Sequence, residues 1–168
     1  MDRPDQFETD RLVLLRPRLS HACALLRFFA DSDAMRYTLT FKDIRECRRH
    51  IAGHECQRRK NGYGPWTVVE RSSGQIIGFG GICDDPFEPG WGIEIGYHFD
   101  QSAWGNGYAT ELVRFCLQMA RRQHGARELQ GFVHPDNAAS RRVLERTGFE
   151  QQQFVTELNR YRYIRRLG

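Results

Sequence analysis

A glycine-containing turn lies between a strand-like segment and an amphipathic segment, in the run Trp104-Gly105-Asn106-Gly107-Tyr108-Ala109-Thr110. Glycines let the backbone turn tightly and approach a ligand closely. A helix that follows offers unpaired N–H groups and the positive end of its dipole. A phosphate or pyrophosphate is therefore a natural ligand, although an ordinary glycine-rich turn explains the pattern equally well. The run matches neither the P-loop nor the dinucleotide fingerprint, which argues against NTPase and dinucleotide functions.

A second group of chemically capable residues lies on a polar, helix-like segment, where Cys47, His50 and His54 share one face. The spacing H-x-x-x-H can bind a metal. The segment reads His-Ile-Ala-Gly-His, however, and lacks the glutamate of H-E-x-x-H. We interpret it as a solvated helix face with Cys47 turned toward the core, and we expect no metal site.

The chain has 168 residues, of which 40% are hydrophobic. This length suits one domain, 1–168, with one hydrophobic core that needs no disulfide. The net charge of +4 comes from basic residues spread along the chain. No recognisable base-reading motif accompanies them, so no nucleic-acid partner is expected.

The cysteines and the N-terminus indicate the compartment. Five cysteines occur, an odd number without C-x-x-C spacing, which favours free thiols in a reducing cytosol. The polar, acidic stretch Met1 to Glu8 is not typical of a signal peptide. No apolar run approaches the ~20 residues of a membrane span. The sequence therefore predicts a cytoplasmic protein without a membrane partner.

The elements that must position the turn follow from periodicity. Helices are expected from Ser20 through Phe29, over 43–60, around 109–120 and from 135–137 onward. Strands are expected at 11–16, 66–70, 75–79, 91–99, 128–133, from 149 onward and at 159–167. Strands and helices are mixed, with one β-α-β-α-β run at the C-terminal end. This order predicts an α+β domain with a central mixed sheet.

The run from Glu94 to Glu111 resembles the acetyl-CoA-binding motif of the GNAT acetyltransferases, Q/R-x-x-G-x-G/A. Gly107 and Ala109 match that pattern, and Trp104 stands where Gln or Arg is usual. A Trp there is typical of the branch that contains the ribosomal-protein N-terminal acetyltransferases. Three further segments resemble the same branch in family order: 9–17, 74–81 and 137–149.

The resemblance implies a single GNAT domain. Its sheet would be mostly antiparallel, with six to seven strands and about four flanking helices. It also implies acetyl-CoA as cosubstrate and acetyl transfer to a primary amine. A homodimer is expected by analogy alone. The residues that the resemblance assigns to the cosubstrate are the pantetheine strand Tyr97, His98 and Phe99, the pyrophosphate turn Trp104, Gly105, Asn106, Gly107, Tyr108, Ala109 and Thr110, and the helix residues Asn137 and Ser140.

Acetyl transfer requires a neutral amine, so a general base is expected. Glu94 is the candidate, because some family members place a glutamate in this setting; a paired strand carboxylate is the alternative. His98 shares its strand face and is a second candidate base. Many GNAT enzymes use a tyrosine of the C-terminal helix as general acid, but Leu144 occupies that position here. Ser140 is therefore assigned to thiol contact or proton donation.

The acceptor stays open at this stage. The resemblance implies that the loop with Asp84, Asp85 and Glu88 lies near the acceptor end, where an acidic rim would attract a cationic amine. A solvated turn explains these carboxylates as well. The acceptor could be a protein N-terminus or a small molecule such as a polyamine, an aminoglycoside or an amino acid. An alternative function is a non-catalytic acyl-CoA-binding module that regulates a partner, which the Leu144 substitution allows.

Overall fold

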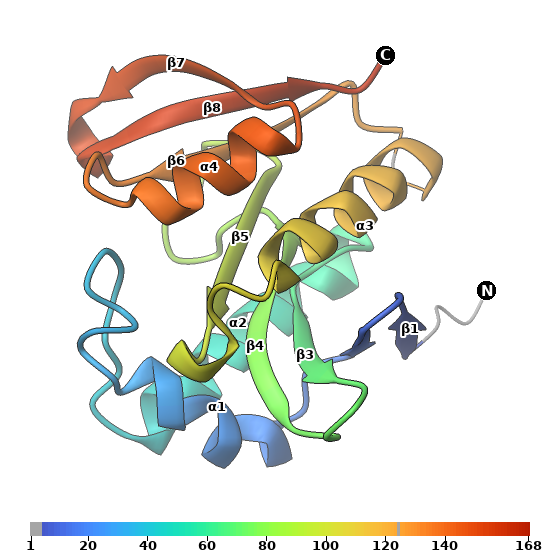
Figure 1. Cartoon of the computed structure of the whole chain (residues 1–168), viewed down its shortest axis with the longest axis vertical. Coiled ribbons are helices and arrows are strands. Elements are labelled where there is room, and N and C mark those ends of the chain that lie inside the picture. The colour runs from blue at the N-terminus through green and yellow to red at the C-terminus, as the bar shows by residue number, and fades with distance from the viewer. Residues whose placement is uncertain (1–4, 124) are drawn as a thin grey trace.

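A single sheet of eight strands forms the centre of the computed structural model, which describes residues 5–123 and 125–168 (Figure 1). Residues 1–4 of the predicted polar N-terminus and His124 lie outside this description. The strand order is β1-β2-β3-β4-β5-β6-β8-β7. Neighbouring strands are antiparallel except β5 and β6, which are parallel. The strands are β1 (Gln6–Glu8), β2 (Leu12–Leu15), β3 (Trp66–Glu70), β4 (Ile76–Cys83), β5 (Glu94–Phe99), β6 (Glu128–Val133), β7 (Glu150–Val155) and β8 (Arg160–Arg166).

Within the described residues four helices cover the sheet: α1 (Ala22–Phe29), α2 (Ile44–Asn61), α3 (Tyr108–Gln123) and α4 (Ala138–Arg146). Helix α2 begins where the Asp43 side chain accepts hydrogen bonds from two backbone N–H groups, and it ends at Gly62 in the left-handed conformation. Asn137 caps α4 in the same way. These caps explain why the helix starts could be read from the sequence.

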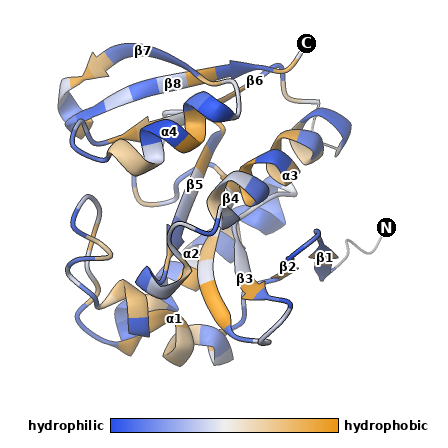
Figure 2. Cartoon of the chain, viewed as in Figure 1, coloured by the Kyte–Doolittle hydropathy of each residue, from blue (hydrophilic) through white to orange (hydrophobic). Residues whose placement is uncertain are grey.

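The helices form a layer on each face of the sheet, and each layer buries its own apolar cluster. Helices α3 and α4 lie on one face with the larger cluster, and α1 and α2 lie on the other (Figure 1). Phe79 of β4 belongs to the α1–α2 side. Figure 2 shows hydrophobic residues concentrated along β3 and β4 and hydrophilic residues along β7. The centre of the sheet is therefore buried on both faces, as continuous apolar runs require.

Strands β5 and β6 separate within the sheet. Among the described residues they are paired at one position, Glu94 with Gln130, although both strands continue beyond it. The Gln130 N–H donates to the Ile93 carbonyl at 3.3 Å. The backbone N–H and C=O groups of successive residues point alternately to the two edges of a strand. Those of Tyr97, four positions after Ile93, therefore point to the same edge, which is open there. The divergence leaves backbone donors and acceptors facing a gap at the middle of the sheet.

The predicted architecture is confirmed, with corrections at the N-terminus. The sheet has eight strands instead of six to seven, because β1 was not predicted. It is a three-residue edge strand with one apolar residue, Phe7, too short for an alternating pattern. Ser20 does not cap a helix; it lies inside a 3-10 turn (Leu19–His21), and α1 begins after His21.

Candidate active site

The glycine turn connects β5 to α3, and its backbone at Gly105 is not covered by the described part of the chain. Gly105 and Gly107 have φ values of +75° and +80°, which side chains with a Cβ rarely adopt. A Cβ built at Gly105 would meet none of the described atoms within 4 Å. The Asn106 side chain donates to two preceding carbonyl oxygens and holds the turn closed. Because α3 begins directly at Tyr108, its first N–H groups add to an anion-binding surface.

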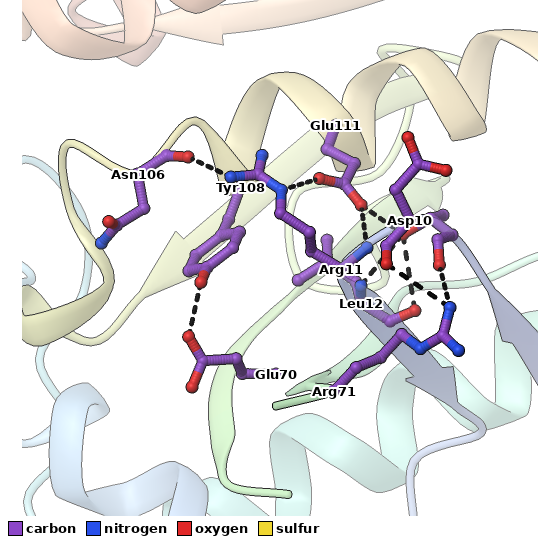
Figure 3. A network of polar contacts seen from close by, with 9 residues as sticks. Asp10, Arg11, Leu12, Glu70, Arg71, Asn106, Tyr108 and Glu111 are labelled. Carbon is purple, nitrogen blue, oxygen red and sulfur yellow. Dashed lines mark hydrogen bonds and ion pairs between the residues drawn. The ribbon is translucent and has the colours of Figure 1, made fainter. Parts of the chain in front are cut away.

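Glu111, in the first turn of α3, ties this glycine turn to the N-terminal segment (Figure 3). Its carboxylate accepts hydrogen bonds from the Thr9 hydroxyl at 2.6 Å and the Arg11 N–H at 2.8 Å. It also pairs with Arg11 Nε at 2.8 Å. The same guanidinium donates to the Asn106 carbonyl at 2.8 Å and lies over the Tyr108 ring. These charge-assisted contacts fix the position of the turn.

A cavity of about 650 Å³ opens where β5 and β6 separate. Its volume lies in the usual range of small-molecule sites. Glu94, Gly96 and His98 line it from β5, and Asn137, Ser140 and Leu144 line it from the α4 side. Further lining residues come from α1, β4, β6, α2, the 37–42 loop, the 85–91 loop and the 157–160 segment. The predicted base and the predicted helix residues therefore share one cavity.

Glu94 is a half-buried carboxyl in the lining of this cavity. Burial raises its pKa to about 8, and the negative charges of Asp85 and Glu88 act in the same direction, whereas Arg160 opposes them. An α-amine has a pKa of about 8. Proton transfer from such an ammonium group to Glu94 is thus close to thermoneutral, which suits a general base.

His98 is a weaker candidate base. Burial lowers its pKa to about 3, assisted by His50 and Arg160. Taking a proton from an ammonium group of pKa about 8 would cost about 7 kcal/mol. Its backbone pairs with Phe79 of β4 and faces away from the gap. The His98 backbone therefore does not offer hydrogen bonds to the gap, while its ring lines the cavity and packs against Phe29.

Two hydroxyl groups lie at the α4 end of the cavity. Asn137 Oδ1 accepts the Ser140 N–H at 3.1 Å, so Asn137 performs the helix-cap role. The Tyr97 hydroxyl donates to the Ser140 carbonyl at 3.3 Å. Sequence reasoning used Tyr97 for its backbone alone and missed this phenol, whose pKa is raised by burial. Leu144 is buried where the family tyrosine was expected.

The other predicted cosubstrate residues differ in their surroundings. The Phe99 ring is buried in the core, and its carbonyl accepts a hydrogen bond from Trp104 Nε1 at 3.1 Å. Trp104 is 46% exposed beside the turn. Ala109 and Thr110 are half-buried at the start of α3. The tryptophan therefore connects the end of β5 to the turn and keeps part of its ring exposed beside it.

The three carboxylates of the acidic loop before β5 make different contacts. Asp85 and Glu88 line the cavity, as the expected rim would. Asp84 instead accepts hydrogen bonds from Asn61 and Tyr63. Two of the three predicted rim carboxylates therefore line the cavity.

The histidine face of α2 is not solvated, which corrects the interpretation from sequence. Cys47 is buried in the α1–α2 cluster, as expected. His54 is buried as well, and His50 stacks on Phe87 with ring centroids 5.4 Å apart. The spacing of polar residues along α2 could not reveal that these histidines are covered, because the covering ring, Phe87, comes from the 85–91 loop. Among the described residues, no group of three His, Cys, Asp or Glu side chains is arranged to hold a metal ion.

Comparison with known families decides what this arrangement is. A family model described as an acetyltransferase (GNAT) domain matches residues 11–150, which include the turn, Glu94 and α4. The chain belongs to the GNAT acetyltransferase family. Membership makes it an acetyl-CoA-dependent N-acetyltransferase, with acetyl-CoA as cosubstrate.

Individual relatives agree with this assignment. The uncharacterized protein YkkB of Bacillus subtilis (strain 168) is 33% identical over 134 residues, which are 79% of this chain and 77% of YkkB. A crystal structure of an acetyltransferase from Agrobacterium tumefaciens str. C58 aligns with a TM-score of 0.83, at 22% identity, over 98% of this chain and 95% of that one. RimL, a ribosomal L7/L12 α-N-protein acetyltransferase in complex with coenzyme A, aligns with a TM-score of 0.77, at 20% identity, over 95% and 96%. At these identities the structures show the shared fold. No helix within the described part of this GNAT enzyme is long and apolar enough to cross a membrane.

We expect Glu111→Gln to weaken acetyl-CoA binding selectively. The variant keeps the shape of the side chain but removes the charge that holds Arg11 and the turn. Because a hydrogen bond to a charged group contributes about 1.5–3 kcal/mol, the KM for acetyl-CoA should rise roughly tenfold while the acceptor KM stays constant. Steady-state kinetics with each substrate varied measure this, and the exposed Glu128→Gln is the control. Equal rises in both KM values would indicate general damage to the fold.

We expect Glu94→Gln to stabilise the GNAT enzyme at alkaline pH. The folded-state pKa of Glu94 is raised, so between about 4.5 and 8 the folded state holds a proton that the unfolded state has lost. The free energy of unfolding of the wild type must therefore fall as pH rises through this window. Glutamine does not ionise, so the variant should gain a few degrees in Tm over the wild type at pH 9 and little at pH 5. Thermal melts at both pH values test this; a constant difference contradicts it.

Proposed function

We propose that this GNAT enzyme acetylates a primary amine by direct attack in a ternary complex, the acceptor being a protein N-terminal α-amine or a small-molecule amine. The observation that carries the proposal is the position of Glu94. It lies in the cavity at the point where β5 and β6 part, with a pKa raised to about 8.

The residues of the turn and of the open strand edge fit the cosubstrate, which supplies an acetyl group activated as a thioester. The backbone N–H groups from Gly105 to Thr110 would bind the pyrophosphate, since the two glycines leave the backbone open. The backbone of Tyr97 would pair with the pantetheine arm at the gap. Asn137 and Ser140 line the far side of the cavity and would contact the same arm.

Proton movement follows from the groups that line the cavity. A Glu94 carboxylate oxygen accepts a proton from the ammonium group of the acceptor, which leaves a neutral nucleophile. When the C–S bond breaks, the Ser140 hydroxyl would donate a proton to the departing thiolate, and the Tyr97 phenol is a second donor beside it. Leu144 takes no part in proton transfer; it packs against β6 and excludes water from this end.

The basicity of Glu94 favours an α-amine over a lysine side chain. A lysine amine has a pKa of about 10.4, so its proton would move to Glu94 with an uphill cost of about 3 kcal/mol, whereas an α-amine of pKa about 8 is matched. RimL, which shares the fold, is described as an α-N-protein acetyltransferase. Both points support an α-amine acceptor.

The deciding experiment measures thiol release from acetyl-CoA with purified protein and a panel of amines. The panel holds peptides with free N-termini, free amino acids, polyamines and aminoglycosides. Acceptor-dependent release establishes the amine acetyltransferase and identifies its acceptor class. Tight acetyl-CoA binding by calorimetry without release on any amine would favour the non-catalytic regulatory module. The homodimer remains a prediction that light scattering would test.

A further inference from the structure

Aromatic rings from five separate segments meet in the lining of the cavity beside Glu94. Phe29 of α1 stacks on Phe41 with centroids 4.7 Å apart, and it lies 5.3 Å from the His98 ring. His50 of α2 lies 5.1 Å from Phe41 and stacks on Phe87 at an interplanar angle of 10°. All five rings line the cavity that contains Glu94. The space beside the base is therefore walled by flat aromatic rings, three of them phenyl groups.

Three large apolar side chains are exposed to solvent in the lining of the cavity. Leu39, Phe87 and Trp91 are 76%, 47% and 36% exposed. They come from the 37–42 loop and the 85–91 loop. Large exposed apolar side chains gathered in one lining mark a binding surface. The α2 backbone is shaped for the Phe87 ring, since a Cβ at Gly53 would approach Phe87 Cζ to 2.7 Å.

The charges around the cavity do not suit a polycation. Burial lowers the pKa values of His50, His54 and His98 to about 3, 4 and 3, so the imidazoles are neutral at physiological pH. Glu88 lies 3.9 Å from Arg160, which offsets its charge. The charged lining residues other than Glu94 are four carboxylates and three cations: Glu46, Asp85, Glu88 and Glu157, with Lys42, Arg49 and Arg160. This near balance leaves, apart from Glu94, an excess of only one negative charge for a polyamine or an aminoglycoside to bind.

We infer that the acceptor is an α-amine and that its α-carbon carries an aromatic or other large apolar side chain. The inference rests on the proposed function and narrows its acceptor. The nitrogen would lie at Glu94, and the side chain would pack against the part of the cavity wall that Phe41, His50 and Phe87 form. This chemistry occurs at a peptide N-terminus and in a free amino acid or its amide, and the two sources are separated by the test.

The test compares acceptors that differ in one side chain. Acetyl-CoA turnover is measured on the tripeptides Phe-Gly-Gly, Leu-Gly-Gly, Ala-Gly-Gly and Lys-Gly-Gly, on phenylalanine and phenylalanine amide, and on spermidine. We expect kcat/KM for the Phe and Leu peptides to exceed that for the Ala peptide by about 10- to 200-fold, the range that apolar pockets achieve. A preference for the tripeptide over phenylalanine amide would identify a peptide acceptor, and the reverse a small molecule. Equal kcat/KM for Phe and Ala peptides, or a preference for spermidine, overturns the inference but leaves amine acetylation intact.

Phe87→Ala locates the effect, because Phe87 is half exposed and its loss should spare the fold. We expect this variant to lose at least tenfold in kcat/KM on Phe-Gly-Gly and less than threefold on Ala-Gly-Gly. The matched control is Phe154→Ala, which removes a ring of similar exposure, 39%, outside the cavity lining. Calorimetric binding of phenylalanine amide and spermidine to the CoA-saturated protein gives a readout without turnover. Tighter binding of spermidine there contradicts the inference even if no acceptor is turned over.

Discussion

Glu94→Gln should reduce kcat by about 10²- to 10⁴-fold at pH 7, the usual contribution of a general base. In the wild type, kcat should rise with pH and level off above about 8, because burial holds the Glu94 carboxyl protonated below that pH. The variant has no group to titrate at this position, so its residual rate should lack that rise. Stopped-assay pH profiles of thiol release at saturating substrates measure both effects. Affinity for acetyl-CoA should stay within about twofold of wild type, since Glu94 lies away from the glycine turn.

A substitution at Glu88 changes the pKa of Glu94 while leaving the Glu94 carboxyl in place. Glu88 is exposed, and its negative charge raises the pKa of Glu94. It also pairs with Arg160, whose positive charge lowers the pKa of Glu94. Glu88→Gln should therefore shift the midpoint of the pH–rate profile to lower pH while leaving the plateau rate nearly unchanged. A Glu94→Gln variant with wild-type turnover and an unaltered pH profile would remove Glu94 from proton transfer.

Gly107→Ala should weaken the binding of CoA at least tenfold. The residue has a φ of +80°, where a Cβ costs about 1–2 kcal/mol. The Cβ would meet no atom closer than Arg11 Nη2 at 3.6 Å, so the protein itself has room for it. The methyl group would instead occupy the surface on which the pyrophosphate is proposed to lie. Calorimetric titration with CoA gives the change in Kd.

Gly74→Ala is the matched control for this experiment. Gly74 lies in the turn between β3 and β4 with a φ of +69°, and a Cβ there meets none of the described atoms within 4 Å. Both variants should lose similar amounts of thermal stability, but Gly74→Ala should bind CoA as the wild type does. Equal losses of CoA affinity in the two variants would show that strain, and not the position of Gly107, explains the effect.

The parts of the fold that the sequence revealed are those with local signals. Strand β6 was predicted with its observed bounds, and α2 was found because Asp43 caps it and Gly62 ends it. The glycine turn was visible because its chemistry lies within seven consecutive residues. Where the signal was short, as in β1, or ambiguous, as at Ser20, the prediction was wrong.

The acceptor side could not be read from the sequence, because its walls come together only in three dimensions. Phe29, His50, Phe87 and His98 belong to different elements, and nothing in the spacing of His50 and His54 indicates that Phe87 covers them. The pKa of Glu94 likewise depends on burial and on Asp85 and Glu88, which the sequence placed near the acceptor end without distances. Glu94 itself was found through family resemblance, which supplied the position but not the basicity.

The contact between Arg11 and Glu111 joins positions one hundred residues apart, and this has a consequence for the order of folding. Closing so long a loop is entropically costly, so such contacts form late. The turn of Asn106 and Gly107 should then acquire its final shape after the rest of the domain has condensed. Because Arg11 contacts both Glu111 and the turn, CoA that binds the folded turn must also stabilise the position of β1 and β2. Protease resistance of the N-terminal segment should therefore increase when CoA is bound, so this end of the chain would report occupancy of a site formed far along the sequence.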